Sequence, residues 1–412
     1  MNTLKDHISE KCPISLNQWG FCATKSTSMA LASTVHGWVS SLQSGFDVCT
    51  VFFDLKKAFD SVPHQHLLEK LTKLELPPPL LQWLRDYLTN HFQQVNIAST
   101  ASTLHPVLSG VPQGSILGPL LFIFYIDDIN SVKLSEQASL TLYADDICYT
   151  HPVTAKDTFE GIQQDIDKIV SWSAKNKLTF NESKTVWMLL TKKRLHHFTS
   201  VDLHLNGKKI VRVNEVRYLG VLITADLTWS AHIESVIQKA KRRLGYVYRT
   251  FYKNCSTEVL LNLYKSLIRP MLEYCCLVWD PSSKILINTL EGTQKLAAKI
   301  CSKDWNSPYA CLLEKLGLPT LQSRRSYIKL CTVYKILSEE SYFPSGFFTY
   351  RNSAVNTRSY NPLHLSTYNC TTTYFMTSFV PHSISLWNSL PSAVTSSPTL
   401  ASFKYALCYV LF

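Results

Sequence analysis

The stretch LTLYADDICYT, residues 140–150, decides how this chain can fold. Apolar and polar residues alternate on both sides of Ala144-Asp145-Asp146, and such alternation is typical of half-buried strands. A tight turn between two such strands makes a β-hairpin, so both acids are expected at the tip of the hairpin. Paired acids at a turn are commonly just solvated turn residues, so a second acid-bearing element is needed before this pair indicates chemistry.

Residues 46–54, FDVCTVFFD, supply that element. They are β-branched and aromatic, which predicts a buried strand that ends at Asp54. If this strand and the hairpin share one antiparallel sheet, Asp54, Asp145 and Asp146 meet, and their like charges repel unless a cation lies between them. Oxygen ligands of this kind suit Mg²⁺. Two such ions, about 3.5–4 Å apart, clamp the attacking and leaving oxygens of a phosphoryl displacement, which indicates nucleotidyl transfer.

Composition bounds the class of protein. The chain has 412 residues, 46% apolar and 17% charged, which excludes a disordered polymer. Its longest apolar stretch, Ile116 to Ile126, is about half the ~20 residues that a membrane-spanning helix needs. No secretory signal is visible after Met1, and the twelve cysteines form no C-x-x-C pair. We therefore expect an intracellular protein without a membrane span, in the nucleus or the cytoplasm, and not a secreted one.

The net charge of +11 is unevenly distributed. Residues 1–183 carry −5, residues 184–253 carry +10, and residues 254–412 carry +6. A basic block in mid-chain is an electrostatic signature of a polyanionic partner, because each neutralised phosphate releases condensed counterions. A solvated lysine-rich surface remains the alternative.

The remaining elements follow from periodicity and turn residues. We expect helices within residues 67–88, broken by Pro77 to Pro79, a helix capped by Ser115 and buried to about residue 129, and an amphipathic helix over 158–172. Asp127 and Asp128, which end the buried helix, are interpreted as solvated. Short strands are expected at 186–190, 201–205 and 218–223, and a mostly helical region at 231–340. Residues 351–412 contain no Asp or Glu, and we expect a separate small module there.

Within the first helix of the helical region, apolar residues recur at three- and four-residue steps. Basic residues fall outside that stripe, so one face should pack and the other should be basic. The apolar stripe is Ile233, Ile237, Ala240, Leu244 and Val247, and the basic residues are Lys239, Arg242, Arg243 and Arg249.

Five motifs in order resemble the successive palm motifs of a reverse transcriptase, in the wording of non-LTR retrotransposons. They are FDLKKAFD at 53–60, SGVPQGS at 109–115, YADD at 143–146, the set Trp172, Asn176, Leu178, Asn181, Lys184 and Thr185, and YLG at 218–220. QWGF at 18–21 with Ser26-Thr27 resembles the fingers motif of that family. LYKSLIRP at 263–270, LEY at 272–274 and VWDP at 278–281 resemble its thumb, and WNSLP at 387–391 with Phe403-Lys404 resembles its C-terminal end.

The resemblance implies a role for each matching residue. Asp54, Asp145 and Asp146 would hold two Mg²⁺ ions, for which Mn²⁺ can substitute. Phe59 would exclude a ribose 2′-hydroxyl, although a plain core phenylalanine is the alternative. The nucleotide-binding set would be Phe59, Gln113, Gly114 and Lys184, with Lys184 protonating the leaving pyrophosphate; a surface lysine is the alternative there. Tyr218, Leu219 and Gly220 would lie in the turn that grips the primer end. Lys239, Arg242, Arg243 and Arg249 would contact nucleic-acid phosphates.

The fold class that follows is α+β, a right-hand polymerase with an antiparallel-sheet palm flanked by helices. We expect partial fingers over 1–48, palm over 49–224, helical thumb and connection over 225–340, and a C-terminal module over 341–412. The expected partners are an RNA template, a DNA primer and dNTPs, and no membrane; the oligomeric state stays open.

The sequence also departs from the family. Cys22 stands where the family usually has arginine after Gly-Phe. From the start at Met1 we expect this copy to lack the family's basic fingers segment, which lies upstream of the motif at residue 18, and its endonuclease domain. These features suggest an N-terminally truncated copy. A catalytically impaired remnant that only binds nucleic acid is therefore an alternative, as is an RNA-dependent RNA polymerase, against which Phe59 argues.

Overall fold

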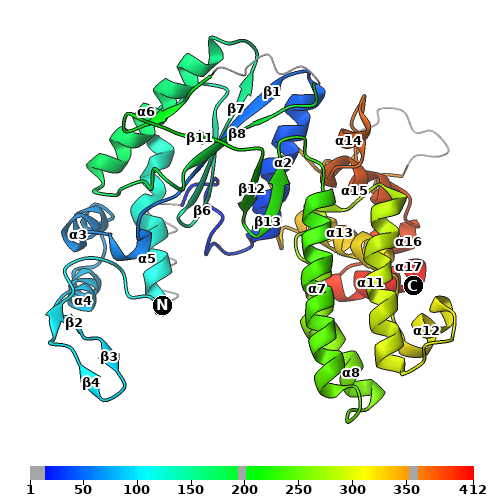
Figure 1. The fold of residues 1–412 in the computed structure, drawn as a ribbon. Coiled ribbons are helices and arrows are strands. Elements are labelled where there is room, and N and C mark those ends of the chain that lie inside the picture. Colours follow the sequence, from blue (N-terminus) through cyan, green and yellow to red (C-terminus); the bar gives the residue numbers. More distant parts are fainter. Residues whose placement is uncertain (1–13, 194–200, 352–360) are drawn as a thin grey trace. The chain divides into compact units, whose positions relative to one another are not determined.

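The computed structural model describes residues 14–193, 201–351 and 361–412 (Figure 1). Its contacts divide the chain into two compact units. The first comprises Met1–Ala23 with Phe46–Asn214, and the second comprises Thr24–Gly45 with Glu215–Phe412. Both units mix sheet and helix, as the sequence predicts, while the boundaries expected for fingers, palm and thumb stay predictions.

A five-stranded sheet organises the first unit, in the order β11-β8-β1-β7-β6. The strands are β11 (Val211–Arg212), β8 (Val186–Leu190), β1 (Asp47–Phe53), β7 (Asp146–Val153) and β6 (Ser139–Tyr143). β1 pairs antiparallel with both β7 and β8, and all seven of its residues are buried. The continuous apolar run at 46–54 thus belongs to a central strand covered on both faces. The hairpin at 140–150 and the strand at 186–190 are confirmed.

The helices of the first unit are α3 (His64–Thr72), α4 (Pro78–Leu88), α5 (Leu117–Ile126) and α6 (Thr158–Lys175), with 3₁₀ turns at Ala58–Asp60 and Asp127–Ser131. Of these, α5 and α6 lie beside the sheet, whereas α3 and α4 lie beyond α5 (Figure 1). The expected break at Pro77 to Pro79 is confirmed. The N-cap residue of α5 is Ile116, one position after the predicted Ser115, but the Oγ of Ser115 does accept the amide of Gly118 in the first turn at 2.9 Å. From Leu121 to Ile126, α5 is buried all round.

Short ribbons complete the first unit. They are β2 (Phe92–Gln93) with β5 (His105–Pro106), β3 (Asn96–Ile97) with β4 (Thr100–Ala101), and β9 (His204–Leu205) with β10 (Lys208–Lys209). The strand expected at 201–205 is therefore confined to its last two residues.

The interpretation of Asp127 and Asp128 as solvated is confirmed for Asp128, which is exposed, but it missed that both acids are hydrogen-bonded to distant parts of the chain. The carboxylate of Asp128 accepts the indole Nε1–H of Trp172 at 2.9 Å and the Nζ of Lys70 at 2.9 Å. Asp127 accepts the backbone amide of Ser15 at 3.0 Å. The two acids tie the end of α5 to α6, to α3 and to the N-terminal segment, which a single sequence cannot show because all partners are distant in the chain.

The second unit is largely helical, as predicted for residues 231–340. Its helices are α2 (Thr27–Gln43), α7 (Ser230–Phe251), α8 (Thr257–Leu263), a π-helix (Tyr264–Ile268), α9 (Arg269–Glu273), α10 (Cys276–Trp279), α11 (Lys284–Ser302), α12 (Tyr309–Leu316), α13 (Leu321–Leu337), α14 (Thr373–Met376), α15 (Phe379–Asn388), α16 (Ser392–Thr395) and α17 (Leu400–Leu411). Among the described residues, no helix combines the length and the apolarity that crossing a bilayer requires.

The single strand expected at 218–223 was wrong. The structure has a hairpin there, β12 (Glu215–Tyr218) and β13 (Val221–Thr224), with a two-residue turn. Both turn residues have positive φ, 45° at Leu219 and 82° at Gly220. Two-residue turns of this kind prefer Asn-Gly or Asp-Gly, so with leucine at the first position the residue pattern misses the turn, which only the family resemblance placed here.

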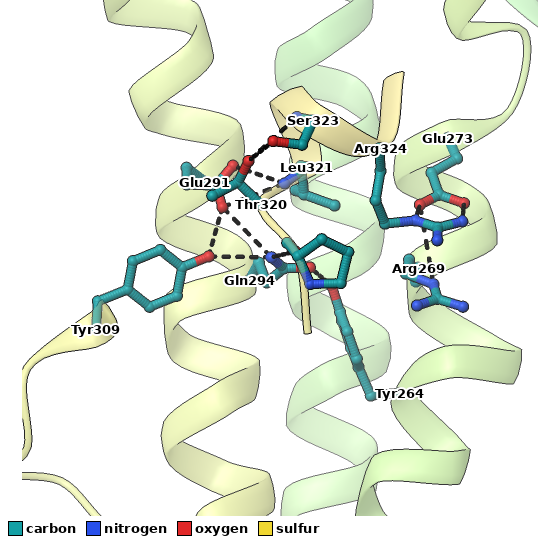
Figure 2. Close-up of polar contacts among 11 residues, drawn as sticks. Tyr264, Arg269, Glu273, Glu291, Gln294, Tyr309, Thr320, Leu321, Ser323 and Arg324 are labelled. Carbon is teal, nitrogen blue, oxygen red and sulfur yellow. Dashed lines mark hydrogen bonds and ion pairs between the residues drawn. The ribbon is translucent and has the colours of Figure 1, made fainter. Parts of the chain in front are cut away.

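A polar network holds the helices of the second unit together (Figure 2). Gln294 on α11 accepts the hydroxyl of Tyr264 at 2.6 Å and donates to the carbonyl of Pro319 at 2.9 Å. The carboxylate of Glu291 accepts the hydroxyl of Tyr309 and, at 3.1 Å, the amide of Leu321 at the start of α13. One turn of α11 thereby fixes the π-helix, α12 and α13 relative to one another.

Residues 361–412 pack within the second unit instead of standing alone. Asp280 is the centre of one junction: it accepts Arg325 Nε at 2.5 Å and Lys329 Nζ at 2.7 Å, both from α13. Burial alone would raise the pKa of Asp280, but the charges of Lys329 and Arg325 outweigh burial and lower it. Lys329 also donates to Nδ1 of His382 on α15 at 2.8 Å. Buried charges need such partners, so this junction specifies how α15 docks.

The second junction joins α2 to the C-terminal part of the second unit through the buried ring of His36. His36 on α2 lies against Phe347, Tyr368 and Phe375, with ring centroids 4.7, 5.9 and 5.7 Å away. Burial lowers the pKa of His36 from 6.5 to about 4. The folded protein therefore keeps this ring neutral at pH values where the unfolded chain protonates it.

We predict that His36 makes the protein sensitive to acid. Between pH 6.5 and 4 the unfolded chain binds a proton that the folded chain does not, so the free energy of unfolding falls as pH drops through this window. From pH 7 to pH 5 the wild type should lose about 2 kcal/mol more than His36→Leu does. Urea titrations at both pH values measure this difference. The same substitution at the exposed His204 is the control, and equal losses in wild type and His36→Leu would contradict the prediction.

Candidate active site

An open cleft of about 710 Å³ lies in the first unit beside the end of β1. Five of the residues singled out in the sequence line it: Asp54, Phe59, Gln113, Asp145 and Lys184. They come from four segments that are distant in the chain, and the fold of the first unit brings them to one cleft. Asp146 and Gly114 are not part of the lining.

The strand register places the acids. Phe53 is paired with Ile147 across β1 and β7, so the next residue outward on each strand is Asp54 and Asp146 respectively. Tyr143 pairs with Asp146 across the hairpin, which leaves Ala144 and Asp145 as the two residues of its turn. The acids at the hairpin tip and at the strand end, expected from the sequence, are thus neighbours at one edge of the sheet.

Their charges interact. Burial raises the pKa of Asp145, and the negative charge of Asp54 raises it further. The pKa of Asp146 is raised to about 6, first by lost hydration and then by the charges of Asp145 and Asp54. The side chain of Asp146 still reaches the surface, so neighbouring groups displace only part of its water. A cation at this edge of the sheet would relieve the repulsion.

The backbone of Asp54 is held by the segment after α6. Its carbonyl accepts the amide of Asn181 at 2.7 Å, and its amide donates to the buried hydroxyl of Thr185 at 3.3 Å. The amide of Lys56 donates to the carbonyl of Thr179 at 2.8 Å. This short pairing fixes the residues just beyond β1 and carries Lys184, which is exposed, to the rim of the cleft.

The ring of Phe59 packs on the core and also borders the cleft. Its ring stacks on Phe122 of α5, with centroids 4.3 Å apart and planes 21° from parallel. It is only half-buried and lines the cleft, so it is not a plain core residue. Because Phe122 is fully buried, the ring of Phe59 cannot retreat into the core without displacing it.

Gln113 is oriented by Asp60. Its Nε2 donates to Asp60 Oδ1 at 2.8 Å, so Asp60, the last residue of the motif at 53–60, orients the side chain of Gln113. Gly110 makes this loop possible: it has φ of 93°, and a Cβ there would lie 2.8 Å from the Cα of Asp60. Gly114 also has positive φ, at 80°, but open space surrounds it.

Sequence reasoning missed what supports the hairpin turn of Ala144 and Asp145, which we call the acid turn. Ala144 has φ of 53°, a conformation that alanine rarely adopts. The buried Oε1 of Gln18 accepts the amide of Ala144 at 3.0 Å and that of Gly20 at 2.9 Å. A Cβ on Gly20 would lie 2.5 Å from the nitrogen of Ala144. The QWG motif was noted, but only the fold shows that it lies directly against the turn that carries Asp145.

The carboxylates at this edge of the sheet offer the oxygen ligands that Mg²⁺ prefers. Among the described residues, no three His, Cys, Asp or Glu side chains already surround a common metal position. Asp54 and Asp145 nevertheless line the same cleft, and Mg²⁺ is usually bound by one or two carboxylates, with water and substrate phosphates completing the shell.

The other predicted site residues belong to the second unit. The turn at Leu219 and Gly220 packs on Tyr274, whose hydroxyl donates to the carbonyl of Leu219 at 3.0 Å, while Tyr218 is buried. On α7 the apolar stripe is buried as predicted, and the predicted basic residues are exposed. Those basic residues are Lys239, Arg242, Arg243 and Arg249.

Comparison with known proteins identifies a matching family and similar curated proteins. The family model of "Reverse transcriptase (RNA-dependent DNA polymerase)" matches residues 1–223. A probable RNA-directed DNA polymerase from transposon X-element of Drosophila melanogaster is 30% identical over 74% of this chain and 34% of its own length. The RNA-directed DNA polymerase from the D. melanogaster mobile element jockey is 26% identical over the same shares of the two chains. The chain thus spans about a third of these curated relatives.

Among solved structures, apo telomerase from Candida tropicalis aligns with a TM-score of 0.44 and 12% identity, over 82% of this chain and 58% of the telomerase. The family match covers more than half of the chain and includes the strand, the hairpin and the cleft described above. This chain therefore belongs to the reverse transcriptase (RNA-dependent DNA polymerase) family, and its curated relatives are of the non-LTR retrotransposon kind.

Proposed function

We propose that this chain synthesises DNA on an RNA template, adding dNTPs to the 3′-hydroxyl of a DNA primer. The observation that carries the proposal is the cleft shared by Asp54, Asp145, Phe59, Gln113 and Lys184. In the reaction the primer 3′-oxygen bonds to the α-phosphorus of the dNTP, the α–β phosphoanhydride bond breaks, and pyrophosphate leaves. The five-stranded sheet is the palm in this proposal, and we place the activity in the nucleus or the cytoplasm.

Asp54 and Asp145 are the proposed metal ligands, with Asp146 beside them. Two Mg²⁺ ions, or Mn²⁺ in their place, would supply charge stabilisation for the attacking and leaving oxygens. The raised pKa values of Asp145 and Asp146 support this role, because carboxylates that repel one another across a cleft are poised to take up a cation. The firm hold on the Asp54 backbone keeps one ligand in place before substrate arrives.

The neighbouring side chains select and orient the nucleotide. Phe59, backed by Phe122, would meet the sugar and leave no room for a ribose 2′-hydroxyl. Gln113, oriented by Asp60, would contact the incoming nucleotide with Gly114 beside it. Lys184, exposed at the rim, would donate a proton to the leaving pyrophosphate.

The second unit would hold the nucleic acid. We propose that the turn of Tyr218, Leu219 and Gly220 grips the primer end, since packing on Tyr274 makes it rigid. The exposed basic face of α7 would contact phosphates of template and primer, and α7 with the following helices would form the thumb. A remnant that only binds nucleic acid remains the second candidate, because the basic face of α7 is independent of the acids.

Replacing one acid should abolish synthesis. We predict that Asp145→Asn lowers the rate of primer extension on an RNA template with dNTPs and Mg²⁺ by roughly 10³-fold, because charge stabilisation in the cleft is lost. Asp86→Asn, on the exposed face of α4, is the matched control and should extend as the wild type does. Equal extension by wild type and Asp145→Asn would refute the site. Salt-sensitive binding without any incorporation in the wild type would favour the binding remnant.

Replacing Phe59 should weaken the selection of deoxyribonucleotides over ribonucleotides. Phe59→Val removes the part of the ring that faces the cleft, so ribonucleotide incorporation relative to dNTP incorporation should rise roughly 10- to 200-fold. Phe59→Tyr keeps the ring and should keep the discrimination. Competition between rNTPs and dNTPs in single-nucleotide extension measures the ratio. An unchanged ratio in Phe59→Val would show that Phe59 only packs on Phe122.

Loss of the amide oxygen of Gln18 should loosen the acid turn. Gln18→Met leaves the amides of Ala144 and Gly20 without their acceptor, at a cost of about 1–3 kcal/mol for each buried group. We predict a fall in kcat larger than any change in the KM for dNTP. Adding Ala144→Gly should restore part of kcat, because glycine adopts positive φ without strain.

The matched control for Gln18→Met is Gln65→Met, which removes an exposed amide on α3. Chemical denaturation of each variant separates lost stability from lost turn geometry. A double variant no more active than Gln18→Met would contradict the argument.

A further inference from the structure

Three aromatic side chains form a cluster in the second unit, just where α7 and α11 end along the chain. Tyr248 lies in the last turn of α7 and Tyr252 directly follows that helix, with their ring centroids 4.6 Å apart. Trp305, just beyond the end of α11, meets Tyr248 edge to face at 6.3 Å. We call Tyr248, Tyr252 and Trp305 the aromatic cluster.

The aromatic cluster is rigid although it is open to solvent. The indole Nε1–H of Trp305 donates to the hydroxyl oxygen of Tyr252 at 3.1 Å, and the carbonyl of Trp305 accepts Lys299 Nζ at 2.8 Å. Tyr248 and Trp305 nevertheless remain 40% and 43% exposed. Rings that only closed a core would bury this area, since each exposed Å² of apolar surface costs roughly 25 cal/mol.

The charge around the aromatic cluster is positive. Residues 246–253 and 299–305 carry Arg249, Lys253, Lys299 and Lys303 against one carboxylate, Asp304. Asp304 is occupied within its own loop, where it accepts the hydroxyl of Ser307 at 2.6 Å and the amide of Asn306 at 3.1 Å. Lys303 Nζ lies 5.6 Å from the ring centroid of Tyr252, which leaves its charge beside the exposed rings.

A further ring interrupts the basic face of α7. Tyr246 is 56% exposed. It follows Arg242 by four residues and precedes Arg249 by three, so the three side chains share one face of the helix. Aromatic faces interleaved with cations are the arrangement by which proteins bind unpaired nucleic-acid strands: bases stack on the rings and phosphates meet the cations.

We propose that the aromatic cluster is a stacking platform for an unpaired base of a single-stranded nucleic acid, whose phosphates contact Arg249, Lys253 and Lys303. Unpaired strands fit better than duplex, because the faces of paired bases are already covered by their neighbours in the stack. The proposal rests on the nucleic-acid partner of the proposed function, but it does not depend on catalysis at the acids.

The test is binding of the full chain to a fluorescent oligothymidylate and to a duplex of equal length, followed by anisotropy without dNTPs. Trp305→Ala should weaken binding of the single strand by roughly five- to a hundredfold and leave duplex binding within twofold. The slope of log affinity against log salt should stay unchanged in Trp305→Ala, and should fall by roughly 0.7 in Lys303→Gln.

Two further variants keep the test decisive. Trp83→Ala is the matched control, because Trp83 is 49% exposed and stacks on Tyr87 in the first unit, outside the basic surface; it should bind as the wild type does. Trp305→Phe keeps a stacking face and should retain most of the affinity even if Trp305→Ala unfolds. Equal loss for both probes, or no loss, would overturn the platform. A wild type that extends primers while Trp305→Ala binds normally would refute this inference alone, whereas a wild type that neither binds nor extends would refute the proposed function too.

Discussion

The pairing of β1 with β7 is the constraint on which the candidate site depends. Its register sets Asp54 opposite Asp146 and brings the hairpin turn with Asp145 to the same edge. A slip of one residue would turn every β1 side chain to the opposite face of the sheet. Because all residues of β1 are buried, such a slip would disrupt packing on both faces. The hydrophobic core, and no interaction between the acids themselves, therefore fixes where the acids lie.

The acid turn shows a cost that the surrounding fold offsets. Ala144 is held at positive φ, which is unfavourable for any residue with a Cβ. Gln18 supplies an acceptor to its amide, and Gly20 leaves room that any larger residue would fill. Strained residues persist where their surroundings over-determine them, and they cluster at functional sites. The N-terminal motif that looked like a separate element thus serves as the backing of the acid turn.

Periodicity predicted the elements whose burial pattern is regular. The strand ending at Asp54, the hairpin and the stripe of α7 each show their period in the sequence, and the structure has them at the expected residues. The five cleft residues could be named from motif resemblance. Prediction failed where a partner distant in the chain or an unusual φ decides the conformation. The bond from Trp172 to Asp128 was missed because the two residues lie forty-four positions apart, and periodicity alone missed the turn at Leu219.

The basic block also needed the fold before it could be interpreted. The boundary between the units, after Asn214, cuts the block of 184–253 in two. In the first unit its lysines meet acids: Lys208 pairs with Glu182 and Lys209 with Asp202. Within the ranges that the structure describes, the basic residues of α7 are not paired with acids in this way.

There, Lys239, Arg242 and Arg249 have no ion pair among the described residues, and all three are exposed. Cations already paired within the protein release few counterions on binding a polyanion, whereas unpaired cations can neutralise phosphates directly. The net charge of the block therefore overstates the free positive charge of its first part, and α7 carries exposed cations without an ion pair in the part of the chain that the structure describes.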